Sequence, residues 1–247
     1  MHIILVADLH LSSSPADSFG IDTVANFERV ISRIIAHQPD HIVMMGDYSL
    51  KAPMRQDVER VHARLTEVGV PFSFISGNHD NSIDVAGVCC ENTPPVDGEL
   101  YYRKDLNGSS CLFLDTAKGH ISETQKTWLA NELSDEQRTT HVFMHHPPIH
   151  MGVPFMDDNH AISDEGGELF EILFSGNRPV HVYSGHYHTA RSTQVGIHSV
   201  HLCPSTYFQL DPNLKEFGVS HSMPGIRHVQ MIGNQTRSWI EFLPKRG

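Results

Sequence analysis

The chain has 247 residues, a formal net charge of -11 and four cysteines. Its acidic balance, without basic clusters, argues against a nucleic-acid polymer as partner, because such binders usually carry a basic face. The cysteines show no C-x-x-C spacing, which argues against a structural zinc site or a disulfide framework. No apolar run approaches the roughly 18 residues that cross a bilayer, and the start lacks a basic signal-peptide region. We therefore expect one cytoplasmic domain over residues 1–247, with no membrane partner.

In the first eighty residues, short apolar runs that stop at polar residues predict buried strands. The runs cover residues 3–7, 42–45 and 72–75. Between them, apolar residues recur at helical spacing over 24–35 and 58–68, which predicts two helices. This alternation predicts a βαβαβ unit with a parallel sheet.

Beyond residue 95 the pattern changes to a hairpin followed by further strands and helices. The apolar segments 100–106 and 111–116 flank Asn107-Gly108, which is typical of a hairpin turn. Helical patterns precede two further buried runs, and the tail reads as antiparallel strands. These predicted helices cover 123–133 and 165–174, the two buried strands 142–144 and 180–183, and the tail strands 197–202, 227–232 and 237–243. The segment 150–164 reads as a loop, either part of a pocket wall or plain surface.

Asp, His or Asn residues follow five of the predicted strands, where ligands of open α/β sheets gather. The candidate metal ligands are Asp8, His10, Asp47, Asn78, His145, His186 and His188. Two carboxylates, one amide and four imidazoles are too rich in nitrogen for calcium and suit Mn, Fe, Zn or Co. Seven ligands exceed what one catalytic ion can use, so we expect two ions. Asp47 is the expected bridge, because it follows the middle strand of the βαβαβ unit.

As an ordered set, these motifs resemble the calcineurin-like metallophosphoesterases. The motifs are D-x-H at 8–10, G-D at 46–47, G-N-H-D at 77–80, H-H-P-P at 145–148 and G-H-x-H at 185–188. Within that superfamily the chain looks closest to the class III cyclic-nucleotide phosphodiesterases and the glycerophosphodiesterases. The segments that support this branch are 114–116, 125–129 and 203–206.

The resemblance implies an α/β fold, a four-layer α/β/β/α sandwich of two mixed sheets. It implies Asp8, His10, Asp47 and His188 on one ion, and Asp47, Asn78, His145 and His186 on the other. His145 is preferred to His146 because the family ligand stands two residues before the proline. The ions are expected to be manganese or iron, with zinc or cobalt as alternatives, and a homodimer is a further expectation. One departure from the family pattern is 48–53, which follows G-D and puts the pocket wall in doubt.

The expected reaction is hydrolysis of a small phosphodiester, such as a cyclic nucleotide or a glycerophosphodiester. Two ions about 3.5–4 Å apart would lower the pKa of a shared water, and the hydroxide would attack phosphorus in line. His79 is the candidate catalytic acid for the leaving alkoxide, or it only bonds a phosphate oxygen. His150, His160, Arg191 and Tyr207 are candidates for substrate contact.

Three other functions remain open on the same sequence. They are a phosphomonoesterase, a nucleotide or lipid pyrophosphatase, and a non-catalytic scaffold of the same fold. The scaffold is the weakest alternative, because all seven ligands and His79 are present.

Overall fold

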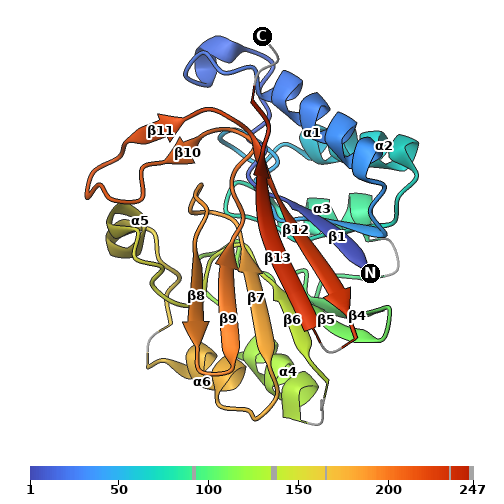
Figure 1. The fold of residues 1–247 in the computed structure, drawn as a ribbon, viewed down its shortest axis with the longest axis vertical. Coiled ribbons are helices and arrows are strands. Elements are labelled where there is room, and N and C mark those ends of the chain that lie inside the picture. The colour runs from blue at the N-terminus through green and yellow to red at the C-terminus, as the bar shows by residue number, and fades with distance from the viewer. Residues whose placement is uncertain (91–92, 135–137, 165, 234, 245–247) are drawn as a thin grey trace.

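The computed structural model describes residues 1–90, 93–134, 138–164, 166–233 and 235–244. They form two mixed β-sheets with helices on the outer faces (Figure 1). The strand order is β13-β12-β1-β2-β3 in the first sheet and β4-β5-β6-β7-β9-β8 in the second. The expected α/β sandwich of two mixed sheets is confirmed.

The first sheet contains the predicted βαβαβ unit. Its three parallel strands are joined by two helices, and two antiparallel strands from the tail extend it on the β1 side. The elements are β1 (His2–Val6), α1 (Thr23–His37), β2 (His41–Met44), α2 (Arg55–Val68), β3 (Phe72–Phe74), β12 (Gly225–Ile232) and β13 (Gln235–Phe242). β2 lies between β1 and β3, so Asp47, which follows β2, lies after the middle one of the three parallel strands.

The second sheet begins with the predicted hairpin and continues with three parallel pairings. Its elements are β4 (Tyr102–Leu106), β5 (Ser109–Phe113), α4 (Glu123–Ser134), β6 (Thr140–Phe143), α6 (Glu168–Phe174), β7 (Val180–Ser184), β8 (Ser192–Val195) and β9 (His198–Leu202). The predicted start of α6 at residue 165 lies outside the described residues. A two-stranded ribbon, β10 (Gln209–Leu210) and β11 (Val219–His221), stands apart from both sheets.

Two sequence expectations are wrong in part. Of the three tail strands, β12 and β13 are antiparallel as expected, but β9 joins the second sheet, where it is antiparallel to β8 and parallel to β7. A largely buried strand such as β9 pairs on both edges, and its partner β8 is too polar to be recognised as a strand. The segment 150–164 is not all loop, because it contains the short helix α5 (Pro154–Asn159). The helix α3 (Ser82–Cys89) was also not foreseen.

Three apolar clusters fill the three interfaces between the four layers. Ile4 and Val6 of β1 pack with α1 and α2, whereas Ile3 and Leu5 pack between the sheets. This follows from the alternation of side chains along a strand. A third cluster joins the second sheet to α4 and α6. Among the described residues, no helix is long and apolar enough to cross a membrane.

Candidate metal centre

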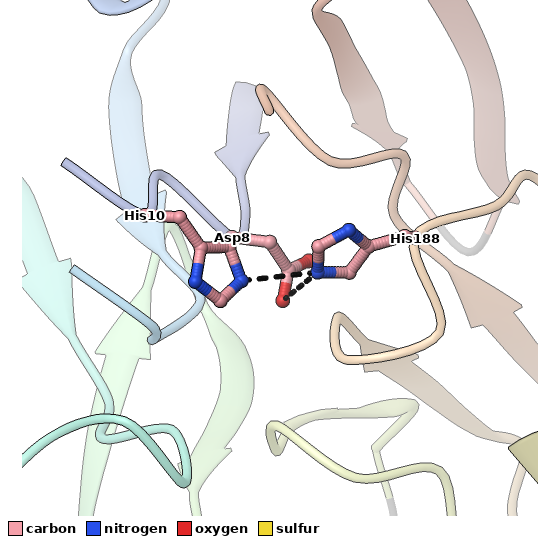
Figure 2. Close-up of side chains that lie close together, drawn as sticks. All are labelled: Asp8, His10 and His188. Atoms are coloured by element: carbon pink, nitrogen blue, oxygen red, sulfur yellow. Dashed lines mark hydrogen bonds and ion pairs between the residues drawn. The ribbon is translucent and has the colours of Figure 1, made fainter. Parts of the chain in front are cut away.

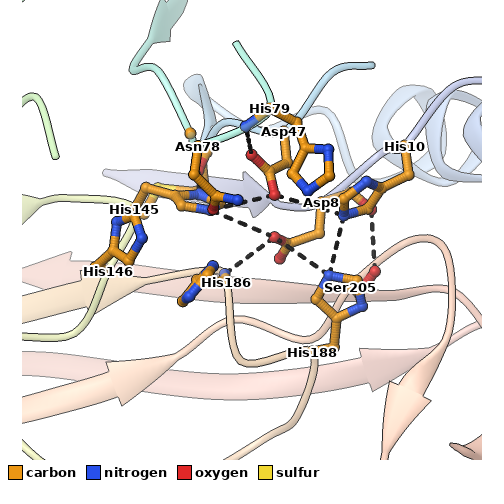
Figure 3. Close-up of polar contacts among 12 residues, drawn as sticks. Asp8, His10, Asp47, Asn78, His79, His145, His146, His186, His188 and Ser205 are labelled. Carbon is orange, nitrogen blue, oxygen red and sulfur yellow. Dashed lines mark hydrogen bonds and ion pairs between the residues drawn. The ribbon is translucent and has the colours of Figure 1, made fainter. Parts of the chain in front are cut away.

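The seven predicted ligands meet where strands of both sheets end (Figure 3). The first sheet supplies Asp8 and His10 after β1, Asp47 after β2 and Asn78 after β3. The second sheet supplies the three remaining imidazoles, from His145, His186 and His188. The site therefore exists only when the two sheets pack together.

Three of these side chains form one donor group (Figure 2). Donor atoms of Asp8, His10 and His188 lie within 4.8 Å of one another. The Nε2 atoms of His10 and His188 are 3.1 Å apart, and His188 Nε2 is 3.6 Å from Asp8 Oδ1. The lone pairs of this group thus converge on one small volume.

A second donor group lies beside the first. It consists of Asp47, His145 and His186, again within 4.8 Å. His145 Nε2 is 3.3 Å from Asp47 Oδ2 and 3.1 Å from Asn78 Oδ1, which brings the amide oxygen to this group. Asp47 Oδ2 is also 3.5 Å from His10 Nε2. One carboxylate oxygen therefore faces both groups, as a bridging ligand would.

The donor atoms fit a pair of transition-metal ions better than they fit one another. Asp8 Oδ2 is buried and has no hydrogen-bond partner among the described residues. Several separations, such as 3.6 Å from His188 Nε2 to Asp8 Oδ1, are too long for a hydrogen bond. Ligands about 2.1 Å from a shared ion would lie at comparable separations.

Outer contacts fix which ring nitrogen each of two histidines offers. His145 Nδ1 donates to the Met45 carbonyl oxygen at 2.8 Å, so Nε2 is the ring nitrogen that faces Asp47. His186 Nε2 donates to the His160 carbonyl oxygen at 3.0 Å, which leaves Nδ1 free to bind. Such contacts orient metal-binding imidazoles and raise their basicity.

Asp80 is a supporting residue that the sequence reasoning missed. Its carboxylate is buried and accepts three backbone N–H groups: Asp47 and Gly77 at 2.7 and 2.8 Å, and Tyr48 at 2.9 Å. It thereby ties the loop after β2 to the loop after β3. Burial, and then the nearby charge of Asp47, raise the pKa of Asp80 to about 7. Its place in the G-N-H-D motif was the available signal.

The backbone at the strand ends is unusual. Of the nine non-glycine residues with positive φ among those described, five are candidate ligands: Asp8, His10, Asp47, His186 and His188. This left-handed conformation is unfavourable for residues with a Cβ and is found at functional sites. Glycine is required at position 46 because the loops after β2 and β3 approach each other closely there. A Cβ at Gly46 would lie 2.5 Å from the Gly77 nitrogen.

Burial also sets the charge of the donors in the metal-free chain. It lowers the pKa of His10 to about 4 and that of His188 well below the usual value, so both rings are neutral and able to bind a cation. Burial raises the pKa of Asp8 to about 8. For Asp47, the opposing effect of burial is outweighed by His145, which holds the carboxyl pKa well below its ordinary value.

A cavity of about 400 Å³ opens onto this centre, a size typical of small-molecule sites. His79 lines it, with Nδ1 donating to the Lys51 carbonyl oxygen at 2.9 Å and its backbone N–H donating to Asp47 Oδ1 at 2.8 Å. Its side chain also lies close to His10 and Asp47. The departure at 48–53 does shape the wall, because Leu50 and Lys51 line the cavity.

The structure separates the remaining candidates into two groups. His160 and Tyr207 line the cavity, whereas Arg191 instead donates to the Gly152 carbonyl oxygen. His150 is not among the cavity-lining residues. His146 packs against His186, with ring centroids 4.1 Å apart, and its Nδ1 lies 3.0 Å from Thr116 Oγ1. His146 is therefore a packing partner of the candidate ligand His186.

The segment 203–206, named above for its resemblance to one branch of the family, contacts the backbone of Asp8. The hydroxyls of Ser205 and Thr206 donate to the Asp8 carbonyl oxygen at 3.0 and 3.2 Å. These two bonds hold the strand end in place.

Comparisons with known proteins agree with this geometry. The profile of the family described as "Calcineurin-like phosphoesterase" matches residues 1–190. A "Probable cyclic nucleotide phosphodiesterase" of Fibrobacter succinogenes is 30% identical over 237 residues, 96% of this chain and 92% of the relative. The glycerophosphodiester phosphodiesterase GpdQ of Enterobacter lignolyticus is 26% identical, over 83% of this chain and 77% of the relative.

Among solved structures, a dimetal phosphatase from Danio rerio superposes with a TM-score of 0.69 at 12% identity, covering 96% of this chain and 95% of that one. GAP50, described as the anchor in the inner membrane complex of Plasmodium, gives 0.63 at 13% identity, covering 98% and 84%. At such identities these two likenesses show the fold alone. With the family match over most of its length, this chain belongs to the calcineurin-like phosphoesterase family of metal-dependent phosphoesterases.

Proposed function

We propose that the chain is a dinuclear phosphodiesterase that hydrolyses small phosphodiesters. The observation that carries this proposal is the pair of donor groups that share Asp47 Oδ2 at the bottom of a cavity. The proposed ligands are Asp8, His10, Asp47 and His188 for one ion, and Asp47, Asn78, His145 and His186 for the other. Since both sheets supply ligands, we propose that residues 1–247 act as a single domain.

The donor chemistry supports two transition-metal ions, with manganese or iron foremost and zinc or cobalt as alternatives. When bound, such a pair supplies an activated water and positive charge for phosphoryl oxygens. The protein's part is to hold the donors rigidly, through Asp80 and the carbonyl oxygens of Met45 and His160.

His79 is the proposed proton donor for the leaving oxygen. Its Nδ1 proton is held by the Lys51 carbonyl oxygen, so Nε2 is the nitrogen available to exchange a proton at the cavity. Its backbone N–H donates to Asp47, which couples the position of the acid to that of the bridging carboxylate. A positioned acid of this kind typically accelerates a reaction by about 10²–10⁴-fold.

Two names among the relatives, cyclic nucleotide phosphodiesterase and glycerophosphodiester phosphodiesterase, motivate the choice of a diester over a monoester. The cytoplasmic location and the homodimer, both expected from the sequence, remain predictions.

The test is a substrate panel assayed with added manganese, alongside metal analysis of the purified protein. The panel contains cyclic AMP, a glycerophosphodiester, a monoester and a nucleotide pyrophosphate. We expect about two ions per chain and the highest kcat/KM for a diester. A clear preference for the monoester or the pyrophosphate would replace the proposal, and no turnover of any member would favour a scaffold.

A further inference from the structure

Aromatic side chains gather on one side of the cavity in front of the candidate metal centre. Five of them line it, and none is a candidate ligand: Phe19, Phe155, Tyr207, Phe208 and Phe217. They come from three distant segments, namely the loop before α1, the helix α5 and the region around the β10–β11 ribbon. The fold therefore assembles this aromatic wall, as it assembles the ligands.

Phe19 is the unusual member of the wall. Its side chain is 72% exposed, the largest value among the exposed large apolar residues of the described chain. Its backbone is left-handed, with φ of 51°, which is rare for a bulky residue. Core packing explains neither feature, because the ring faces open space. Strained residues of this kind cluster at ligand clamps.

Other aromatic rings connect Phe19 with the candidate metal centre. The buried ring of Tyr207 lies 6.4 Å from it at an interplanar angle of 19°, and that of Phe208 lies 6.0 Å away at 72°. Tyr207 in turn lies 5.4 Å from His10. Phe217, which is 50% exposed, is 6.0 Å from Phe19. Two exposed rings thus lie beside two buried rings, and the ring of Tyr207 lies next to the candidate ligand His10.

The chemistry of this wall favours a flat ring in the substrate. An aromatic face stacks on any nucleobase, because every base presents a π-face. A glycerol group has no such face. A choline group binds aromatic rings through cation–π contacts, but its usual site is a cage of rings that encloses it, whereas Phe19 and Phe217 are largely exposed. An acyl chain would bind aliphatic side chains equally well and needs no ring held at a fixed orientation.

We propose that Phe19 and Phe217 form a platform that stacks on the base of a nucleotide diester whose phosphate lies at the metal centre. This inference rests on the proposed function and narrows it: the preferred diesters carry a nucleobase, and the platform determines that preference. Tyr207 and Phe208 act as positioning residues behind the platform.

The first test compares two substrates in Phe19→Ala, Phe19→Trp and the unchanged protein, all loaded with manganese. We expect Phe19→Ala to lower kcat/KM for cyclic AMP about tenfold, chiefly through KM, and to leave glycerophosphoglycerol, which has neither a base nor a cation, within about twofold. Phe19→Trp should restore the cyclic AMP value. Phe170→Ala, which removes an exposed ring on α6 that does not line the cavity, is the matched control. An equal loss on both substrates, or none on cyclic AMP, would overturn the platform.

A second test is independent of turnover. Calorimetry should show that the manganese-loaded protein binds AMP about tenfold more tightly than ribose 5-phosphate, and that Phe19→Ala removes this difference. Equal affinities in the unchanged protein would refute the platform. If no diester is hydrolysed but the AMP preference depends on Phe19, the proposed function fails while the platform stands. A Phe19-dependent preference only for diesters with long acyl chains would instead identify a lipid site.

Discussion

Histidines and carboxylates gather at both ends of the first sheet, yet the two clusters differ in kind. The metal centre follows the ends of β1, β2 and β3, whereas the second cluster lies where β1 begins. We call this second group the edge cluster, and it consists of His2, His37, His228 and Glu241. Three of its donor atoms also lie within 4.8 Å of one another.

In the edge cluster, each close contact is an ordinary hydrogen bond. His37 and His228 donate from Nε2 to Glu241 Oε2 at 2.7 and 3.2 Å, and His228 Nδ1 accepts from His2 Nε2 at 3.0 Å. Arg33 pairs with the other oxygen of the same carboxylate. Protons and an arginine therefore satisfy this cluster. In the metal centre, Asp8 Oδ2 and the Nδ1 atoms of His10 and His188 are buried and have no hydrogen-bond partner among the described residues. Residue types alone do not distinguish the metal centre from the edge cluster. The difference lies in whether the buried donor and acceptor atoms have hydrogen-bond partners.

The largest expected effect comes from removing the central carboxylate of each cluster in turn. Asp47→Ala should lower phosphodiesterase kcat/KM about a thousandfold and reduce the metal content, because it removes the donor that both groups share. Glu241→Ala should leave metal content and kcat/KM unchanged and lower the free energy of unfolding by about 1–3 kcal/mol. Metal analysis, kinetics and denaturant unfolding measure these outcomes. A loss of bound metal in Glu241→Ala would erase the contrast.

A histidine from each cluster gives the next comparison. His79→Ala should lower the rate about a hundredfold for a diester with a poor leaving group and much less for bis(p-nitrophenyl) phosphate, because nitrophenolate leaves without a proton. His37→Ala is the matched control and should change neither rate. If His79→Ala slows both substrates equally, His79 is not the acid, and phosphate or metal binding becomes its role.

A smaller effect is expected at the carboxylate that braces the metal centre. An asparagine at position 80 cannot accept all three backbone N–H groups that Asp80 accepts. Asp80→Asn should therefore weaken manganese binding about tenfold to a hundredfold. Titration against a chelating dye measures the affinity, with the half-buried Asp84→Asn as control. Unchanged affinity would limit Asp80 to a role in folding.

The last prediction is a pH dependence of the free energy of unfolding that arises in the edge cluster. Burial lowers the pKa of His228 to about 4, although the bond to Glu241 acts in the opposite direction. The unfolded chain thus binds a proton near pH 6.5 that the folded chain takes up only near pH 4. The stabilisation by neutral His228 is complete above pH 6.5 and is lost as the pH falls toward 4.

The measurement is the free energy of unfolding at pH 7 and pH 4.5 for the unchanged protein and for His228→Gln, both freed of metal by a chelator. The unchanged protein should lose about 2 kcal/mol more than the variant over this interval. If the unchanged protein and His228→Gln lost the same free energy of unfolding, His228 would have the same pKa in the folded and the unfolded chain.

The elements that the sequence predicted correctly are those marked by a local sequence pattern. The βαβαβ unit and the hairpin follow from periodicity and an Asn-Gly turn, and both were confirmed. The helix α3 was missed because it is short, apolar on several sides and contains Gly87, so no stripe marks it. The parallel partnership of β9 with β7 depends on long-range packing that no local pattern encodes.

The candidate site shows the same division. The predicted ligands and His79 converge because each lies within five residues after the end of a strand, a pattern that is visible in the sequence. Asp80 and the carbonyl oxygen of His160 were not foreseen, since a backbone acceptor has no sequence signature. The aromatic wall was also missed, except for Tyr207, because its rings are far apart in the chain.

The left-handed backbone at five candidate ligands bears on how this fold could change in evolution. Glycine adopts that conformation freely, asparagine and aspartate tolerate it, and β-branched residues do not. A descendant that gave up its metals would therefore exchange Asp8 or His186 for glycine or asparagine far more readily than for valine. Such exchanges would leave the loop conformations unchanged. A descendant without metals or catalytic activity could therefore keep the fold and serve as a binding surface.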